Sequence, residues 1–319
     1  MKKILILHTG GTISMSSDSQ GNVIQNSQNP LVTESFNLDN ISLHTEDIFN
    51  LPSPHIRLED MLILKNRVEK ALTDENFDGV VITHGTDTLE ETAYFLDLTL
   101  PLGNPVVLTG AMRSSNEIGT DGHYNFLSAI RVASHSSSKN RGVLVVMNGE
   151  VHAARFVTKT HTESISTFQT PTHGPIGILT HRSILYHQTI ENLYQVNISQ
   201  VRGRVPIIKA YSGMDGEIFD LLDINSLDGL IIEALGAGNL PPKAFKSVKF
   251  FLKKRIPVVL TSRCFSGIAE PIYAYSGGGV ELSKAGIMFA KEINSQKARI
   301  KLILALNASI TNLKDFIEN

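Results

Sequence analysis

Short runs of apolar, largely β-branched residues recur along the chain, and segments with helical spacing lie between them. The runs that we predict as buried strands cover residues 3–8, 79–83, 105–109, 142–147, 205–210, 229–233 and 257–262. The segments that we predict as helices, from apolar residues spaced three or four apart, cover residues 58–72, 88–98, 124–134 and 242–253. Strands that alternate with helices indicate βαβ units and a mostly parallel sheet. The pattern therefore predicts an α/β protein.

The length of the chain and the spacing of these elements predict two α/β domains. With 319 residues the chain can bury more than one hydrophobic core. We expect a larger N-terminal catalytic domain with a mostly parallel sheet over residues 1–190 and a linker over 191–204. A smaller, Rossmann-like C-terminal domain is expected over 205–319.

Composition narrows the class of protein. Hydrophobic residues make up 42% and charged residues 19% of the chain, as in an ordinary globular protein, and the net charge of −2 predicts no nucleic-acid or membrane partner. The single cysteine, Cys264, excludes an intramolecular disulfide. The apolar run at 4–7 is too short for a signal peptide, and no run is long enough to span a bilayer. We therefore expect a cytoplasmic protein.

Small, polar turn residues follow the first two predicted strands. Gly-Gly-Thr stands at 10–12, and His-Gly-Thr-Asp stands at 84–87. In open parallel sheets, ligands bind outside the carboxyl ends of the strands, near a switch point of the topology. Two strand ends that each carry a Gly-Thr step therefore predict one site.

The second turn also has a purely structural interpretation. Asp87-x-x-Glu90 and Thr88-x-x-Glu91 both fit a capping box, in which side chains bind the unpaired N–H groups of a first helical turn. On this interpretation Thr86, Asp87 and Thr88 only begin a helix.

The segment 14–30, directly after Thr12, is rich in Ser, Asn and Gln and shows no periodicity. We interpret it as a mobile lid over the site, with a surface loop of no function as the alternative.

Thr12 is the candidate nucleophile of this site. The glycines before it allow backbone N–H groups to approach a ligand, which suits either a phosphate or the oxyanion of a reacting carbonyl. The turn lacks the lysine of a P-loop and the spacing of a dinucleotide fingerprint. A threonine hydroxyl needs a base, and the sequence offers Lys159, Asp87, His8 and His84. No cluster has the spacing of metal ligands, so we predict no metal site.

Six stretches of the chain resemble the bacterial-type L-asparaginase family. The two most specific are HTGGTIS at 8–14 and ITHGTDTLEETA at 82–93. The other four, in matching order, are TGAMR at 109–113, DGHYN at 121–125, FVTKTHT at 156–162 and GAGNLP at 236–241. The resemblance covers nearly the whole chain. The NLPSPH stretch at 50–55 and the lack of a signal peptide resemble the cytoplasmic type I branch.

This resemblance implies hydrolysis of the side-chain amide of L-asparagine to L-aspartate and ammonia, with no metal and no cofactor. Thr12 would be the nucleophile that forms an acyl-enzyme ester. Thr86, Asp87 and Lys159 would form a second, hydrogen-bonded triad. The resemblance also implies a homotetramer built from close dimers.

The same resemblance implies the substrate contacts around the amide. The N–H groups of Gly11 and Thr86 would polarise the amide carbonyl. The carbonyl oxygen of Ala111 would accept a hydrogen bond from the leaving amide.

The remaining implied contacts fix the amino-acid end of the substrate. Ser53 would bind the α-carboxylate, and Asp87 would also pair with the α-ammonium group. Asn239 would reach the site from a neighbouring subunit. Two features depart from the family: the lid has no tyrosine, with Asn22 standing about where type I members carry one, and Pro54 replaces the glutamine of secreted relatives.

Alternative functions stay open at this point. The nearest are a broader glutaminase-asparaginase and the asparaginase-like subunit of a tRNA-dependent amidotransferase, which usually has an additional N-terminal domain. A catalytically weak amino-acid sensor would agree with the missing lid tyrosine. A nucleotide-binding module fits neither glycine motif.

Overall fold

The computed structural model describes residues 1–26, 30–32, 40–191 and 194–319. They form two compact units, Met1–Gln195 and Val196–Asn319. The expected domain limits at 190 and 204 stay predictions, and the expected linker includes residues 192 and 193, which lie outside the described residues.

The first unit is built on an eight-stranded sheet in the order β12-β11-β8-β7-β6-β5-β1-β4. Its strands are β1 (Lys2–His8), β4 (Ile41–Asp47), β5 (Gly79–Thr83), β6 (Val106–Thr109), β7 (Val143–Met147), β8 (Glu150–Ala153), β11 (Gly177–Leu179) and β12 (Ile184–Tyr186). Strands β4, β1, β5, β6 and β7 are parallel, and β8, β11 and β12 are antiparallel. The predicted mostly parallel sheet is confirmed.

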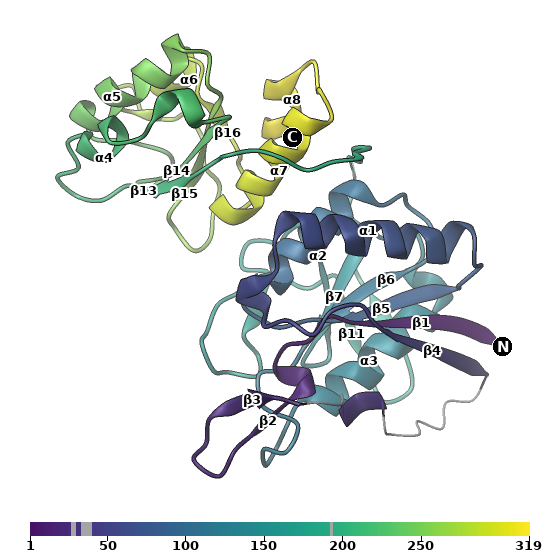
Figure 1. Ribbon diagram of the computed structural model, residues 1–319. Helices are drawn as coiled ribbons and strands as arrows, with labels where there is room; N and C mark the ends of the chain where they lie inside the picture. Colours follow the sequence, from purple (N-terminus) through teal and green to yellow (C-terminus); the bar gives the residue numbers. More distant parts are fainter. Residues whose placement is uncertain (27–29, 33–39, 192–193) are drawn as a thin grey trace. The chain divides into compact units, whose positions relative to one another are not determined.

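Helices cover both faces of this sheet. Helices α1 (Leu58–Thr73) and α2 (Leu89–Thr99) lie on one face, and α3 (Gly122–Ser134) lies on the other (Figure 1). The central strands are consequently fully buried, as the apolar residues of β1 and β5 show. Burial on both faces explains why these strands appear in the sequence as continuous apolar runs rather than as alternating patterns.

The site is positioned by a change of direction in the strand order. From β1 the chain passes to β4 on one side, and then to β5 on the other side of β1. Strands β1 and β5 are parallel neighbours, with His8 paired to Thr83 at their carboxyl ends. The two Gly-Thr turns therefore start side by side at a switch point of the topology, where ligand sites form in open α/β sheets.

The segment after Thr12 has more regular structure than its sequence predicted. It starts with a 3₁₀ turn, η1 (Thr12–Ser14), and continues as an antiparallel hairpin of β2 (Met15–Ser17) and β3 (Val23–Gln25). Residues 27–29 of the predicted lid lie outside the described residues, and η2 (Pro30–Val32) follows them. Strands of three residues are too short to show a period in the sequence, so the hairpin was not predicted, and the role of this segment as a lid stays a prediction.

Several further elements were not predicted, among them an edge strand and a small separate sheet. Strand β4 pairs with β1 along its whole length, but it is an edge strand with a largely exposed, polar second half, so its sequence lacks an apolar run. The polar segment after β8 forms a separate two-stranded sheet of β9 (Thr158–Lys159) and β10 (Phe168–Gln169). Short 3₁₀ turns occur at η3 (Ser53–His55) and η4 (Ser136–Ser138).

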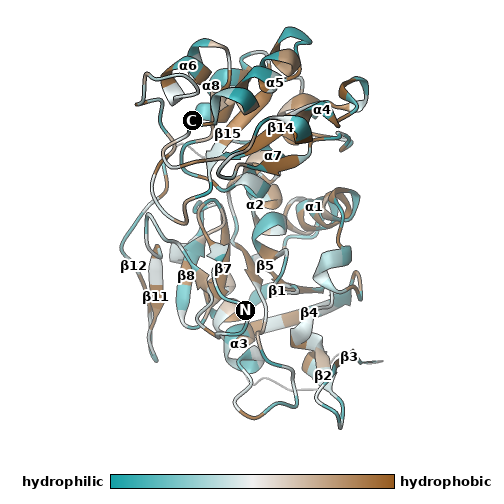
Figure 2. Ribbon diagram, turned by 90° about the vertical axis from the view of Figure 1, so that its left-hand side faces the viewer, coloured by the Kyte–Doolittle hydropathy of each residue, from teal (hydrophilic) through white to brown (hydrophobic). Residues whose placement is uncertain are grey.

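The second unit has a parallel four-stranded sheet in the order β13-β14-β15-β16. The strands are β13 (Ile207–Lys209), β14 (Leu230–Ala234), β15 (Val258–Ser262) and β16 (Met288–Phe289). The helices are α4 (Glu217–Asp220), η5 (Ile224–Ser226), α5 (Pro242–Lys253), α6 (Gly279–Lys284), α7 (Ser295–Asn307) and α8 (Leu313–Glu318). Strands β14 and β15 are hydrophobic along most of their length (Figure 2). A smaller parallel-sheet domain at the C-terminus, as predicted, is confirmed.

Helix α7 was missed because two buried lysines interrupt its apolar pattern. Lys297 is 1% exposed and Lys301 is 3% exposed. The Lys301 ammonium donates to the carbonyl oxygen of Ile317 in α8.

Across the described ranges, no helix combines the length and hydrophobicity that a bilayer crossing requires.

Candidate active site

Thr12 lies in the turn directly after β1. Gly11 has a φ of 85°, a conformation that favours glycine. A Cβ atom at Gly11 would lie 2.3 Å from the Cα atom of Gly85, so only a glycine allows the two turns to touch. The half-buried Thr12 is thereby held against the turn that carries Thr86.

The turn after β6 packs on the same place. A Cβ atom at Gly110 would lie 2.6 Å from the carbonyl oxygen of His84 and 3.2 Å from the Cγ2 atom of Thr86. The turns after β1, β5 and β6 therefore meet at one edge of the sheet. The polar turn residues that follow these strands in the sequence predicted a site at this edge.

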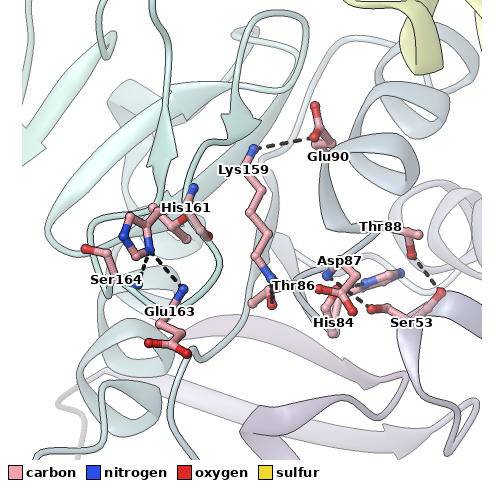
Figure 3. Close-up of polar contacts among 12 residues, drawn as sticks. Ser53, His84, Thr86, Asp87, Thr88, Glu90, Lys159, His161, Glu163 and Ser164 are labelled. Atoms are coloured by element: carbon pink, nitrogen blue, oxygen red, sulfur yellow. Dashed lines mark hydrogen bonds and ion pairs between the residues drawn. The ribbon is translucent and has the colours of Figure 1, made fainter. Parts of the chain in front are cut away.

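Three polar side chains form a hydrogen-bonded group at this edge. The Lys159 ammonium donates to Thr86 Oγ1 at 2.9 Å and to Asp87 Oδ1 at 2.7 Å (Figure 3). Thr86 is buried, whereas the side chain of Asp87 is 60% exposed and that of Lys159 is 16% exposed. Lys159 approaches from β9, 72 residues after Asp87 in the sequence.

These contacts define what the group can do chemically. A lysine that donates to a threonine oxygen has to lose a proton before it can accept the hydroxyl proton. The Asp87 carboxylate accepts the second hydrogen bond of the same ammonium group. The three side chains therefore form one hydrogen-bonded unit, in which Lys159 joins Thr86 to Asp87.

Thr88 and Ser53 link this turn to the segment before α1. Thr88 is the N-cap residue of α2, but its side chain makes no cap hydrogen bond and instead donates to the Ser53 carbonyl oxygen at 2.8 Å. The N–H of Asp87 donates to Ser53 Oγ at 3.2 Å. The capping-box prediction is therefore wrong for Thr88, because a partner distant in sequence has taken its hydroxyl group.

The turn that contains Ala111 is held by the start of α3. The Asp121 carboxylate accepts hydrogen bonds from the N–H groups of Met112 and Arg113, at 3.0–3.1 Å. The Asn125 amide donates to Asp121 at 2.9 Å and, at 3.0 Å, to the carbonyl oxygen that precedes Ala111. These bonds fix the orientation of the peptide groups beside the buried Ala111.

Both parts of the chain match known families. Residues 3–192 match the family described as Asparaginase, N-terminal, and residues 204–315 match the Glutaminase/Asparaginase C-terminal domain. The chain belongs to the asparaginase family.

Similar proteins cover the full length of this asparaginase-family chain. The probable L-asparaginase of Deinococcus radiodurans is 38% identical over 311 residues, which cover 96% of this chain and 94% of that protein. The L-asparaginase of Bacillus licheniformis is 32% identical over 319 residues, covering 98% of each. The crystal structure of a probable cytoplasmic L-asparaginase from Campylobacter jejuni superposes with a TM-score of 0.85, at 30% identity and 99% coverage of both chains.

The two histidines of the motifs in this asparaginase-family chain bind other threonines. His8 Nδ1 lies 2.7 Å from Thr83 Oγ1, and His84 Nε2 lies 2.9 Å from Thr92 Oγ1. Burial lowers the pKa of His8 and the pKa of His84 to about 4. Both rings are therefore neutral near pH 7. Their hydrogen bonds join β1 to β5 and the turn after β5 to α2. Of the four candidate bases, only Lys159 forms a hydrogen bond with Thr86 in the described part of the chain, and Asp87 is bonded to Lys159.

Two residues at the base of the hairpin after Thr12 were not singled out in the sequence. Gln25 Nε2 donates to the carbonyl oxygen of Asn50, and Asn26 Nδ2 donates to that of Ser14, both at 3.0 Å. Asn22, which stands near the expected tyrosine position, lies in the hairpin turn and binds Asp18 instead. The short β-branched pair at 23–24 was the available signal for this strand.

A cavity of about 390 Å³ lies beside the triad. Its walls are formed by Asp87, Glu90, Lys159, Thr160, His161 and Thr162. Glu90 and His161 were not predicted as site residues, although both belong to stretches that resemble the family. Within residues 1–26, 30–32, 40–191 and 194–319, no group of three or more His, Cys, Asp and Glu side chains could hold a metal ion.

Asn239 belongs to the second unit, in the turn after β14. Its Oδ1 atom accepts a hydrogen bond from the N–H of Gly279 at 3.1 Å, and its backbone N–H binds Leu235. Both of these hydrogen bonds join Asn239 to residues of its own domain.

Proposed function

We propose that this protein is an L-asparaginase, which hydrolyses the side-chain amide of L-asparagine to L-aspartate and ammonia. The observation that carries the proposal is the contact of Lys159 with Thr86 and Asp87, next to the Gly11–Thr12 turn. Membership of the asparaginase family and the names of its relatives support the choice of substrate. The proposal includes the cytoplasmic location that is stated for the solved relative.

In the proposed reaction the Thr12 hydroxyl oxygen attacks the amide carbon. The hydroxyl proton passes to the nitrogen, the C–N bond breaks, and ammonia leaves behind an aspartyl ester on Thr12. Water then attacks the ester, which releases L-aspartate and restores the hydroxyl group. The Thr86, Asp87 and Lys159 unit carries protons during these two steps.

The backbone supplies the proposed stabilisation of the tetrahedral intermediates. In this proposal the N–H groups of Gly11 and Thr86 donate to the developing oxyanion, and the Ala111 carbonyl oxygen accepts a hydrogen bond from the amide nitrogen. Donors that are already fixed in place stabilise such charge well, because they need no reorientation during the reaction. The close packing at Gly11 and the Asp121 contacts that hold the Ala111 turn provide this rigidity.

The amino-acid end of the substrate binds Ser53 and Asp87 in this proposal. Ser53 Oγ accepts a hydrogen bond from the Asp87 N–H and can use its own O–H to donate to the α-carboxylate. The Asp87 carboxylate uses one oxygen for Lys159 and is 60% exposed, which leaves room for an ammonium group.

We also propose that the protein assembles as a homotetramer of close dimers, in which Asn239 contributes to the site of a neighbouring subunit. Sedimentation equilibrium tests the assembly, and a monomer at micromolar concentration would contradict it. An Asn239→Ala variant that stays tetrameric should bind asparagine more weakly.

Ammonia release tests the activity. L-Asparagine and L-glutamine are compared at neutral pH with the wild-type protein, with Thr12→Ala, and with Thr73→Ala, a control in which an exposed threonine is changed. We expect turnover of asparagine that Thr12→Ala lowers by at least about 10³-fold and Thr73→Ala leaves unchanged. Unaltered turnover by Thr12→Ala would exclude the proposed nucleophile. Binding of asparagine without ammonia release by the wild type would support an amino-acid sensor instead.

A further inference from the structure

Glu90 carries a buried carboxylate next to the backbone of Lys159, the lysine of the triad. It lies in the first turn of α2 and is 4% exposed. Its Oε1 atom accepts a hydrogen bond from the Thr158 hydroxyl at 3.0 Å. The same oxygen accepts a longer one, of 3.4 Å, from the backbone N–H of Lys159 (Figure 3). The carboxylate is thus bonded to β9, the strand that carries the lysine of the triad.

Strand β9 depends on contacts outside the main sheet. It has two residues and pairs with β10 in a sheet separate from the eight-stranded one. Helix α2, in contrast, packs against β6 and β7 of the main sheet. The Glu90 contacts therefore join a small ladder to the rigid part of the domain.

Residues between 86 and 90 therefore hold Lys159 both at its ammonium group and at its backbone. Thr86 and Asp87 bind its ammonium group, and Glu90 binds its backbone. A free lysine side chain has many rotamers, and fixing it costs conformational entropy. An anchor at the backbone end limits the directions from which the ammonium group can approach.

We propose that Glu90 is a positioning residue, which holds β9 against α2 so that the Lys159 ammonium reaches Thr86 and Asp87. The inference rests on the proposed function of that triad. A carboxylate suits this place because the first turn of a helix favours negative charge, and because hydrogen bonds compensate its burial. Glu90 acts on the reaction through Lys159.

Kinetic constants of four variants test this role. Glu90→Ala removes the acceptor, Glu90→Gln retains a side-chain oxygen of similar position, and Thr158→Val removes the donor at nearly constant shape. Glu59→Ala is the matched control, because Glu59 is an exposed glutamate in the first turn of α1. Because misplacement of a reacting group by about 1 Å can cost about 100-fold, we expect Glu90→Ala to lower kcat by about that factor with little change of KM.

The conservative variant separates positioning from general stability. Glu90→Gln should recover kcat to within about tenfold of wild type, and Thr158→Val should give a loss between the two, because each leaves part of the contact. The double variant of Glu90→Ala and Thr158→Val should lose no more than Glu90→Ala alone, since both changes break the same bond. Wild-type kcat in Glu90→Ala, or additive losses in the double variant, would overturn the proposal.

A second readout needs no turnover. Hydrogen exchange of the amides at 158–160 should become at least about tenfold faster in Glu90→Ala and stay near the wild-type rate in Glu59→Ala. Unchanged exchange in Glu90→Ala would overturn the proposal even if the activity fell. If Glu90→Ala is too unstable for kinetics, Thr158→Val replaces it, and exchange at the wild-type rate in Thr158→Val would then overturn the proposal. If Glu90→Ala exchanges faster but the wild-type protein does not hydrolyse asparagine, the Glu90 contact is correct and the proposed function is wrong.

Discussion

The Lys159 ammonium lies 2.7 Å from the Asp87 carboxylate oxygen, and this contact joins β9 to the turn after β5. The Asp87 side chain is 60% exposed, so water screens the pair. An ion pair in such a place contributes at most about 1 kcal/mol to the free energy of unfolding. Its effect is therefore on the geometry of the triad rather than on stability.

Lys159→Met tests this separation of activity from stability. We expect kcat for asparagine to fall by about 10²- to 10⁴-fold, the range for removal of a group that transfers protons. The free energy of unfolding should change by no more than about 1 kcal/mol, because the Asp87 carboxylate stays hydrated. Urea titration and ammonia release measure the two quantities. An unfolding free energy lowered by several kcal/mol would contradict this view of the pair.

Gly11→Ala tests the contact between the two Gly-Thr turns. The added Cβ atom would meet the Gly85 backbone at 2.3 Å, and the positive φ adds strain, so we expect a loss of more than about 3 kcal/mol in unfolding free energy, together with the activity. Gly21→Ala is the matched control, because Gly21 has nearly the same φ of 84° but no atom within 4 Å of the added Cβ. It should cost only about 1–2 kcal/mol. Equal losses in both variants, by urea titration, would mean that strain alone accounts for the effect.

Asn116→Ala tests how the hairpin is held. The Asn116 amide accepts from the Ser17 N–H at 2.7 Å and donates to the Ser17 carbonyl oxygen at 2.8 Å. Loss of two exposed hydrogen bonds removes about 1–2 kcal/mol of local stability, so exchange of the Ser17 amide should become about tenfold faster. Asn116→Asp keeps the acceptor for this N–H and should give a smaller change. An unaltered exchange rate in Asn116→Ala would show that the hairpin does not depend on this pair.

The buried histidines predict the direction of the pH dependence of stability. Burial lowers the pKa of His8 and of His84 from 6.5 to about 4, so between these values the unfolded chain binds protons that the folded chain does not. The free energy of unfolding should therefore fall as the pH decreases from 6.5 towards 4, by up to about 1.4 kcal/mol per pH unit for each histidine. Urea titrations at pH 7 and pH 5 measure the fall. A variant His8→Asn should show a shallower dependence, and a slope equal to that of the wild type would contradict the role of His8.

Local sequence patterns were enough to predict the class of fold and the strand ends at which the polar turns meet. Strands buried on both faces have to be continuous apolar runs, and turns at their carboxyl ends have to use glycine where backbones touch, as at Gly11 and Gly110. Both signals are local, because burial and backbone conformation restrict each residue type separately. The predicted helices and central strands were therefore confirmed, as was the mostly parallel sheet.

The partners of the polar side chains, in contrast, could not be predicted from local patterns. Thr88 has the sequence of a helix cap, but its hydroxyl group binds the Ser53 carbonyl. Lys159 follows Asp87 by 72 residues, and without the resemblance to a family nothing in the sequence relates the two. The physical reason is that a hydrogen bond depends on the distance and direction between two groups, and folding sets both for groups far apart in the chain. Local pattern determines where a side chain is buried, whereas its partner is determined by the packing of the whole domain.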